Sequence, residues 1–293
     1  MYKQRALVSI TILMLLCWTS GFRQMLSADD AAQDNAWVEE MSKVHSRFSG
    51  QPGTFAQFGD SITVSMAFWA PLAYELKGLS AEDGEVLRRV KKHMIDDCWR
   101  NWKGPEFGNQ GSMTIRWADE NIDGWLTQLN PEVALIMFGT NDIGQVEPSE
   151  FRQKTSDVVR RCLDNGTIVI LSTIPPKSGR LDQCRELAKI IKDIARDHKV
   201  PLVDYFGEAL LRRPNDWDGS IEKFKVVPGD DYQVPTIISR DGVHPSTPRQ
   251  FAGDFSEQAL RSSGYALRSY LVLKAYGNVL DRVVLPVASH KKE

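Results

Sequence analysis

The chain has 293 residues, of which 42% are hydrophobic and 25% are charged, and its formal net charge is -2. That length allows one large domain with an ample core, and the composition is ordinary for a soluble globular protein. A charge so close to zero provides no long-range attraction for nucleic acid or for an anionic membrane, so we expect no nucleic-acid partner.

The first thirty residues have the layout of a secretory signal peptide. Lys3 and Arg5 precede an uncharged, mostly apolar run from Ala6 to Trp18, and small residues suited to cleavage follow it. The run has 13 residues, whereas a membrane-spanning helix needs about 20. We therefore expect residues 1–28 to be removed and the mature protein to be secreted or periplasmic. An uncleaved membrane anchor is the alternative.

Three cysteines remain after this leader, and an odd number permits at most one disulfide within the chain. They are Cys98, Cys162 and Cys184. Cys162 and Cys184 flank a predicted strand and could pair, or all three could be small buried apolar residues. No cluster of cysteine and histidine has the spacing of zinc ligands, so no metal is expected.

After the leader, strand and helix signals alternate along the chain. Short apolar segments bounded by turn-forming residues predict buried strands over residues 54–58, 133–138, 167–173 and 201–205. Apolar residues at spacings of three and four predict helices, which are expected over residues 81–102, 114–129, 181–198 and 256–276. A weaker strand is expected near residues 103–110. This alternation predicts a parallel sheet with helices on both faces.

Residues 212–240 are rich in turn-forming residues and predict a long loop after the last strand. Loops of this length usually have a function or are disordered. No segment has the composition of a linker between two domains. We therefore expect a lead-in over residues 29–53, one domain over residues 54–277 that includes the long loop, and a tail over residues 278–293.

Ser61 follows the first predicted strand directly, within Gly59-Asp60-Ser61. Ligands of open parallel sheets bind beyond the carboxyl ends of the strands, so the Ser61 hydroxyl is expected to face a crevice there. A hydroxyl is a poor nucleophile at neutral pH and needs a base, for which an imidazole with a pKa near 6.5 is suited. Taken alone, Ser61 could equally be a helix N-cap.

His244 is the expected base, because Asp241 stands three residues before it. The carboxylate can accept a hydrogen bond from one ring nitrogen while the other nitrogen faces Ser61, which fixes the tautomer and favours the imidazolium. Pro245 suits the first turn of a helix. The other four histidines lack such a setting, and His93, among charged residues on a predicted helix, is expected to be solvated.

Acyl transfer also requires hydrogen-bond donors for the negative charge that develops on the carbonyl oxygen. Asn141 follows the second predicted strand and supplies a side-chain amide. Gly111 can present a backbone N–H with no side chain in the way, although it could also be only a turn glycine. The N–H of Ser61 is the third donor. We expect Asp60 and Asp142 to form turns or caps.

In this order, the stretches resemble the four blocks of the SGNH/GDSL hydrolase superfamily. They are Gly59-Asp60-Ser61-Ile62, Asn109-Gln110-Gly111, Gly139-Thr140-Asn141-Asp142 and Asp241-Gly242-Val243-His244-Pro245. The resemblance covers residues 54–277. It implies an α/β fold, a flavodoxin-like three-layer α/β/α sandwich with a mainly parallel sheet, and it implies hydrolysis of carboxylic esters.

The expected function is therefore that of a serine ester hydrolase that removes a short acyl group, such as acetyl from a carbohydrate. Ser61 would carry the acyl group, His244 would transfer the proton and Asp241 would orient His244, while Ser61, Gly111 and Asn141 would form the oxyanion hole. Small-molecule or carbohydrate esters are the expected substrates, with no cofactor and no stable membrane span. A non-catalytic carbohydrate-binding module of the same fold and an acyltransferase acting on a sugar acceptor are the alternatives.

Overall fold

The structure is a computed structural model that describes residues 28–286. The chain divides into two compact units, residues 1–36 and residues 37–293. Helix α1 (Ala28–His45) begins in the first unit, and all other elements belong to the second. The predicted signal peptide, residues 1–28, lies outside the described residues except for its last residue. None of the helices between residues 28 and 286 is both long and apolar enough to cross a bilayer.

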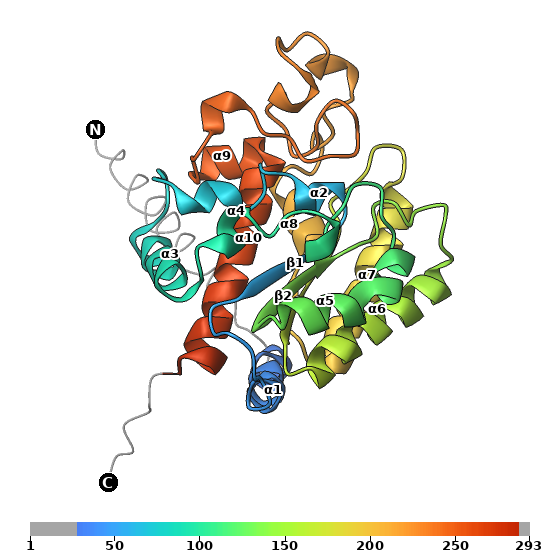
Figure 1. The fold of residues 1–293 in the computed structure, drawn as a ribbon. Coiled ribbons are helices and arrows are strands. Elements are labelled where there is room, and N and C mark those ends of the chain that lie inside the picture. Colours follow the sequence, from blue (N-terminus) through green and yellow to red (C-terminus); the bar gives the residue numbers. More distant parts are fainter. Residues whose placement is uncertain (1–27, 287–293) are drawn as a thin grey trace, which may run out of the picture. The chain divides into compact units, whose positions relative to one another are not determined.

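Four parallel strands form the sheet of the second unit (Figure 1). They are β1 (Phe55–Gly59), β2 (Val133–Met137), β3 (Ile168–Ser172) and β4 (Leu202–Val203), and they lie in the order β1-β2-β3-β4. The first three strands are buried along their whole length, as parallel strands are when helices cover both faces of a sheet. The parallel sheet predicted from these four segments is confirmed.

The weaker strand expected near residues 103–110 is reduced to a bridge, in which Asn109 pairs in parallel with Gly59 at the edge of the sheet. A 3-10 turn (Pro105–Phe107) bends this segment. The buried amide of Asn109 donates to the carbonyl oxygen of Gln57 at 3.0 Å and to two carbonyls of its own loop. The segment is held as a compact loop by these bonds and cannot extend along β1.

Helices lie on both faces of the sheet, which confirms the three-layer α/β/α architecture (Figure 1). One layer consists of α5 (Ile115–Leu129), α6 (Pro148–Asp164) and α7 (Leu181–His198), and the other is built around α10 (Gly264–Val279) and α3 (Ala81–His93). The shorter helices are α2 (Ser61–Val64), α4 (Asp97–Arg100), α8 (Tyr205–Arg212) and α9 (Glu257–Ser262).

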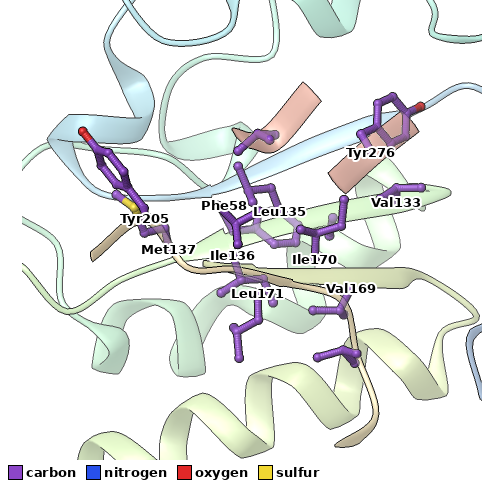
Figure 2. Packing of buried hydrophobic residues seen from close by; sticks show 14 of the residues in the cluster. Phe58, Val133, Leu135, Ile136, Met137, Val169, Ile170, Leu171, Tyr205 and Tyr276 are labelled. Carbon is purple, nitrogen blue, oxygen red and sulfur yellow. The ribbon is translucent and has the colours of Figure 1, made fainter. Parts of the chain in front are cut away.

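Successive side chains of β1 point to opposite faces, and each face meets one helix layer. The ring of Phe55 stacks on Tyr276 of α10 with 4.6 Å between centroids, whereas Phe58 stacks on Trp125 of α5 at 5.3 Å. Figure 2 shows the apolar side chains of β2 and β3, such as Leu135 and Ile170, packed in this core. The sheet is therefore fixed from both sides, which makes its carboxyl edge a rigid support.

Two of the predicted helices are interrupted. The helix expected over residues 81–102 divides into α3 and α4, because the backbone becomes extended at Met94. The helix expected over residues 256–276 divides into α9 and α10 at Ser263, whose hydroxyl accepts a hydrogen bond from the N–H of Ala266 and so begins a new helix. Helix α10 continues to Val279, beyond the expected domain boundary at residue 277.

The three cysteines of the described chain are free and buried. Cys162 and Cys184 do not pair, so the interpretation as small buried apolar residues is the correct one. Burial raises the pKa of Cys98 and of Cys162 to about 12 and that of Cys184 to about 11. Since the thiolate is the reactive form of cysteine, these thiols are inert near neutral pH.

Candidate active site

Ser61 is the first residue of helix α2 and directly follows the turn that ends strand β1. Asp60 is the N-cap of α2, and its carboxylate accepts a hydrogen bond from the N–H of Ile62 at 3.0 Å. Gly59 is required before it, since a Cβ atom there would lie only 2.7 Å from the carbonyl oxygen of Met137. Asp60 thus forms the turn, as expected from the sequence, and the turn presents the Ser61 side chain at the carboxyl edge of the sheet.

His244 connects Ser61 to Asp241. Its Nε2 atom lies 2.9 Å from Ser61 Oγ, and its Nδ1 atom lies 2.7 Å from Asp241 Oδ2. The other carboxylate oxygen, Oδ1, accepts hydrogen bonds from the Ser239 hydroxyl at 2.7 Å and from the N–H groups of Val243 and His244. The structure therefore brings together the serine, the imidazole and the carboxylate that the sequence singled out.

The hydrogen bonds of this chain shift the pKa values of both titratable groups. Burial alone would raise the pKa of Asp241, but the donors from His244, Ser239 and the main chain hold it far below its usual range. The hydrogen bond to Asp241 raises the pKa of His244 above its usual value, although burial acts in the opposite direction. Asp241 is therefore ionised at neutral pH and stabilises a positive charge on the imidazole.

The segment from Asp241 to His244 is a tight turn and not the start of a helix. Gly242 has a φ angle of +74°, and a Cβ atom there would lie 2.7 Å from the Cβ atom of Ser178. Ser178 also donates its N–H to the Gly242 carbonyl at 2.8 Å. Pro245 then forms a bridge with Ile238. The expectation that Pro245 begins a helix is wrong, because this bridge keeps the backbone extended.

The three expected donors of the oxyanion hole lie around the start of α2. A Cβ atom on Gly111 would be 3.8 Å from the Ser61 Cβ atom, so the glycine backbone passes close to the serine. The N–H groups of Ser61 and Gly111 donate no hydrogen bond to any residue between 28 and 286. The Nδ2 atom of Asn141 is engaged, since it donates to Asp60 Oδ2 at 3.3 Å and to the Met113 carbonyl at 3.1 Å.

Asp142 caps a helix, as the sequence indicated. Its Oδ1 atom accepts a hydrogen bond at 2.9 Å from the N–H of Ile115, the first residue of α5. The Oδ2 atom is buried and has no hydrogen-bond partner within the described chain. Burial raises the pKa of Asp142 to about 7, against the hydrogen bond from Ile115. A partly protonated carboxyl group therefore lies next to Asn141 at neutral pH.

Two further residues, one beside the His244 ring and one bonded to Asp241, are not marked by a sequence motif. The ring of Tyr232 lies 6.1 Å from the imidazole between centroids, and this side chain belongs to the long loop of residues 212–240. Ser239 donates to Asp241 from the end of the same loop. The only sequence signal for Ser239 is its spacing of two residues from the carboxylate, which is common in turns. The long loop thus forms one wall of the site.

His45 and His93 lie away from this site. His93 is not solvated, contrary to expectation, because its Nε2 atom lies 2.6 Å from Oε2 of Glu132. His45 approaches the other oxygen of the same carboxylate at 3.1 Å. Glu132 directly precedes strand β2, whereas Asn141 follows its other end. The contacts of Glu132 with the two histidines therefore lie at the amino ends of the strands, opposite the end that carries Ser61. The described residues contain no group of three or more histidine, cysteine, aspartate or glutamate side chains that could hold a metal ion.

A cavity of about 420 Å³ begins two residues beyond the end of α2. Its lining includes Met66, Ala67, Tyr74, Phe251 and Tyr265. Its size is within the range of pockets that hold small molecules. Ser61, Asp241 and His244 are not among its lining residues.

The sequence profile of the GDSL-like lipase/acylhydrolase family matches residues 58–248. The chain belongs to this family. The matched segment includes Ser61, Gly111, Asn141, Asp241 and His244, together with the loop that separates the last strand from the acid and the base. This GDSL-like acylhydrolase is accordingly a carboxylic ester hydrolase.

Solved structures of acylhydrolases have a similar fold. A protein from Bacteroides fragilis that is named as an acylhydrolase is 16% identical to this chain. Its structure has a TM-score of 0.51 over 84% of this chain and 98% of that chain. A lipase/acylhydrolase from Enterococcus faecalis is 18% identical, with a TM-score of 0.47 over 76% and 95%. An acetylxylan esterase from Geobacillus stearothermophilus is 14% identical, with a TM-score of 0.45 over 80% and 96%. No curated protein matches the chain in a sequence comparison.

Proposed function

We propose that this GDSL-like acylhydrolase cleaves its ester through an acyl-enzyme on Ser61. The hydrogen-bonded chain from Ser61 Oγ through His244 to Asp241, with distances of 2.9 and 2.7 Å, is the observation that carries the proposal. His244 Nε2 accepts the hydroxyl proton as Ser61 Oγ bonds to the carbonyl carbon, and Asp241 stabilises the resulting imidazolium. The imidazolium then gives its proton to the departing alcohol, which leaves the acyl group on Ser61.

Water completes the reaction in the second half. His244 removes a proton from a water molecule whose oxygen attacks the acyl carbon, and the Ser61 oxygen leaves with the proton that His244 returns. The balance is one ester and one water consumed, and one carboxylic acid and one alcohol released. These steps use only side chains and backbone groups of this chain.

The negative charge on the carbonyl oxygen would be bound by the N–H groups of Ser61 and Gly111 and by the side-chain amide of Asn141. The two backbone groups have no competing acceptor between residues 28 and 286. Asn141 must release one of its two acceptors, and the 3.3 Å bond to Asp60 is the longer of the two. Removal of one such donor typically lowers kcat by about a hundredfold to a thousandfold.

The proposed substrate is a short acyl ester, such as acetyl, on a small molecule or a carbohydrate. The expected export of the chain, and the lack of an apolar lid segment in its sequence, favour a short acyl group on a carbohydrate. We further propose that residues 1–28 direct export, on the basis of the leader pattern of the sequence. The catalytic domain would then begin after the lead-in of residues 29–53 and include the long loop of residues 212–240.

The test of the reaction is hydrolysis of p-nitrophenyl acetate by the wild-type protein and by Ser61→Ala. We expect the variant to hydrolyse the ester no faster than buffer does. Ser42→Ala is the matched control, because this exposed hydroxyl of α1 donates only to the carbonyl of Val38, and it should leave the rate unchanged. Equal rates for wild type and Ser61→Ala would contradict the proposal.

The substrate class is tested with a series of p-nitrophenyl esters and with acetylated oligosaccharides. The proposal predicts that kcat/KM falls as the acyl chain lengthens from acetate to octanoate, and that free acetate appears from the acetylated sugar. A preference for octanoate would contradict the assignment of a short acyl group. Appearance of acetyl groups on an added sugar, in place of free acetate, would identify a transferase.

A further inference from the structure

Helix α2, which begins with Ser61, is too short to maintain its own conformation. It has four residues, whereas isolated helices shorter than about 12–15 residues are marginal in water. Asp60 caps its first turn. The carbonyl groups at its other end have no partner within the helix and must be satisfied from elsewhere. The groups that satisfy them therefore control how firmly the nucleophile is held.

Two basic side chains bind that end of α2. Arg268 of helix α10 donates to the Ile62 carbonyl at 2.8 Å and to the Thr63 hydroxyl at 2.9 Å. The ammonium group of Lys103 donates to the Thr63 carbonyl at 2.7 Å and to the side-chain oxygen of Gln57 at 3.0 Å. Cations at this end also interact favourably with the dipole of a helix.

These two cations act on α2 without a salt bridge to a carboxylate in the described chain. Arg268 is fully buried, and its Nε atom has no hydrogen-bond partner within residues 28–286. Lys103 is half-buried, and burial followed by the charge of Arg268 lowers its pKa to about 7, so its amine is partly protonated at neutral pH and donates hydrogen bonds in either state. The charge of Arg268 interacts with the buried carboxylate of Asp60 without a direct ion pair, so hydrogen bonds must offset most of the cost of burying it. The hydrogen bonds of both side chains are made mainly to α2, at the Ile62 and Thr63 carbonyls and the Thr63 hydroxyl.

The ring of Phe68 lies against both cations. It is 3.7 Å from the Arg268 guanidinium carbon and 5.5 Å from Lys103 Nζ, measured to the ring centroid, which is within the range of cation–π interactions. A strained turn at the next residue places this ring. Trp69 has φ and ψ angles of +66° and -48°, and the Ala70 N–H donates to the Phe68 carbonyl at 2.8 Å. This γ-turn with positive φ is rare.

We propose that Arg268 and Lys103 are positioning residues that hold α2 so that the Ser61 hydroxyl stays in line with His244. The proposal rests on the reaction proposed for Ser61, and neither cation contacts the reacting atoms. Loss of either would leave one of these two carbonyls without a side-chain donor from residues 28–286, and the 2.9 Å distance from Ser61 to His244 would lengthen. A displacement of about 1 Å at a reacting group can cost about a hundredfold in rate.

The variants Lys103→Met and Arg268→Lys test this proposal. Methionine keeps the length of the lysine without its donors, and a lysine at 268 keeps the charge but cannot reach both acceptors with a planar fork. We expect kcat for p-nitrophenyl acetate to fall about tenfold to a hundredfold with little change in KM. Lys103→Arg, which restores donors, should recover part of kcat. Reaction of Ser61 with a fluorophosphonate should slow in parallel with kcat.

Lys91→Met is the matched control. The ammonium group of Lys91 also binds two main-chain carbonyls at the end of a short helix, the 3-10 helix Ala70–Ala73. These are the carbonyls of Ala73 and Tyr74, at 3.2 and 2.9 Å. Its loss should leave kcat unchanged, and near-UV circular dichroism verifies folding of every variant. If Arg268→Lys does not fold, Lys103→Met and Lys103→Arg decide the outcome.

The results separate the two proposals. Wild-type kcat in folded Lys103→Met and Arg268→Lys, with no activity in Ser61→Ala, would overturn the positioning roles and leave the reaction intact. An equal loss of kcat in Lys91→Met would also overturn them, because it would show that any lost lysine–carbonyl contact has this effect. Full activity of Ser61→Ala would instead overturn the reaction.

Discussion

The Nε2 atom of His244 lies 2.9 Å from the Oγ atom of Ser61, although 183 residues separate the two in the chain. The two side chains reach this distance from separate supports. Ser61 is placed by the end of strand β1 and by the contacts of α2, whereas His244 is placed by a turn at the end of a long loop. The hydrogen bond between them therefore depends on both supports at once, and each support can be weakened separately.

The activity should fall on the acid side with a midpoint above 6.5, the usual pKa of histidine. In the proposed reaction only neutral His244 can accept the Ser61 proton. The hydrogen bond to Asp241 raises the pKa of His244, so protonation should inactivate the enzyme at a higher pH than for an isolated imidazole. The pH dependence of kcat/KM measures this midpoint. A wild-type midpoint below 6 would contradict the coupling to Asp241.

Asp241→Asn should move that midpoint to lower pH. It should also reduce kcat, by roughly 10⁴-fold if the wrong tautomer of His244 is stabilised. The amide cannot stabilise the imidazolium as the carboxylate does, so the pKa of His244 should fall. Asp182→Asn provides the control, because this exposed carboxylate pairs only with Arg185 on the surface. A midpoint that stays in place in Asp241→Asn would show that Asp241 does not set the pKa of His244.

Asn141→Ala should lower kcat by about a hundredfold to a thousandfold while KM changes little. The amide would stabilise a charge that exists only in the transition state, so its loss affects the chemical step more than substrate binding. Asn121→Ala is the control, since this amide donates to the Trp117 carbonyl within helix α5. A rise in KM with an unchanged kcat would assign Asn141 to substrate binding instead.

Much of the site could be predicted because its parts are encoded locally. Ser61 and Asn141 each lie within a few residues of the end of a short apolar strand. Parallel strands bring such residues together at their carboxyl ends. Asp241 and His244 are three residues apart, so one turn suffices to join them. These features depend on a few neighbouring residues, and sequence patterns report on such short distances.

The remaining features depend on contacts between distant segments. Arg268 reaches a carbonyl 206 residues away, and nothing in the sequence around it differs from any helical arginine. His93 resembles a solvated helix residue until Glu132 meets it. The strand expected near residues 103–110 is lost because Asn109 satisfies the main chain of its own loop. In each case the contacts of one side chain determine the local structure, and a local sequence pattern cannot show those contacts.

Asp142→Asn should stabilise the protein relative to wild type, and this gain should be larger at pH 8 than at pH 5. The folded state raises the pKa of Asp142 from 3.8 to about 7, so the stability that this group contributes is complete below pH 4 and is lost as the pH rises through 7. Asparagine cannot ionise and can still accept the hydrogen bond from Ile115, so it avoids this loss, which amounts to a few kcal/mol.

Thermal unfolding of wild type and Asp142→Asn at the two pH values measures the effect, because all other titrating groups are common to both proteins. Asp142→Ala serves as the comparison. It lacks the cap of α5 and should lose about 1 kcal/mol relative to Asp142→Asn at both pH values. The prediction is wrong if the difference in Tm between wild type and Asp142→Asn is the same at pH 5 and pH 8.

Gly242→Ala should lower both stability and kcat, because Gly242 lies within the turn that carries Asp241 and His244. Its φ of +74° disfavours any side chain, and the new Cβ would lie 2.7 Å from the Cβ atom of Ser178. A residue held in such a conformation costs about 1–3 kcal/mol, and the contact with Ser178 must also be relieved by a shift of the turn. Urea unfolding and p-nitrophenyl acetate hydrolysis measure the two effects.

Gly179→Ala separates the backbone cost of that substitution from the displacement of His244. Gly179 has a similar φ of +67°, but a Cβ atom there would meet no other atom within 4 Å. Gly179→Ala should therefore lose a comparable part of its stability and retain its kcat. The double variant Gly242→Ala with Ser178→Gly removes the contact and should recover kcat but not the backbone cost. If Gly242→Ala keeps the kcat of Gly179→Ala, the distance between His244 and Ser61 does not depend on how closely this turn packs against Ser178.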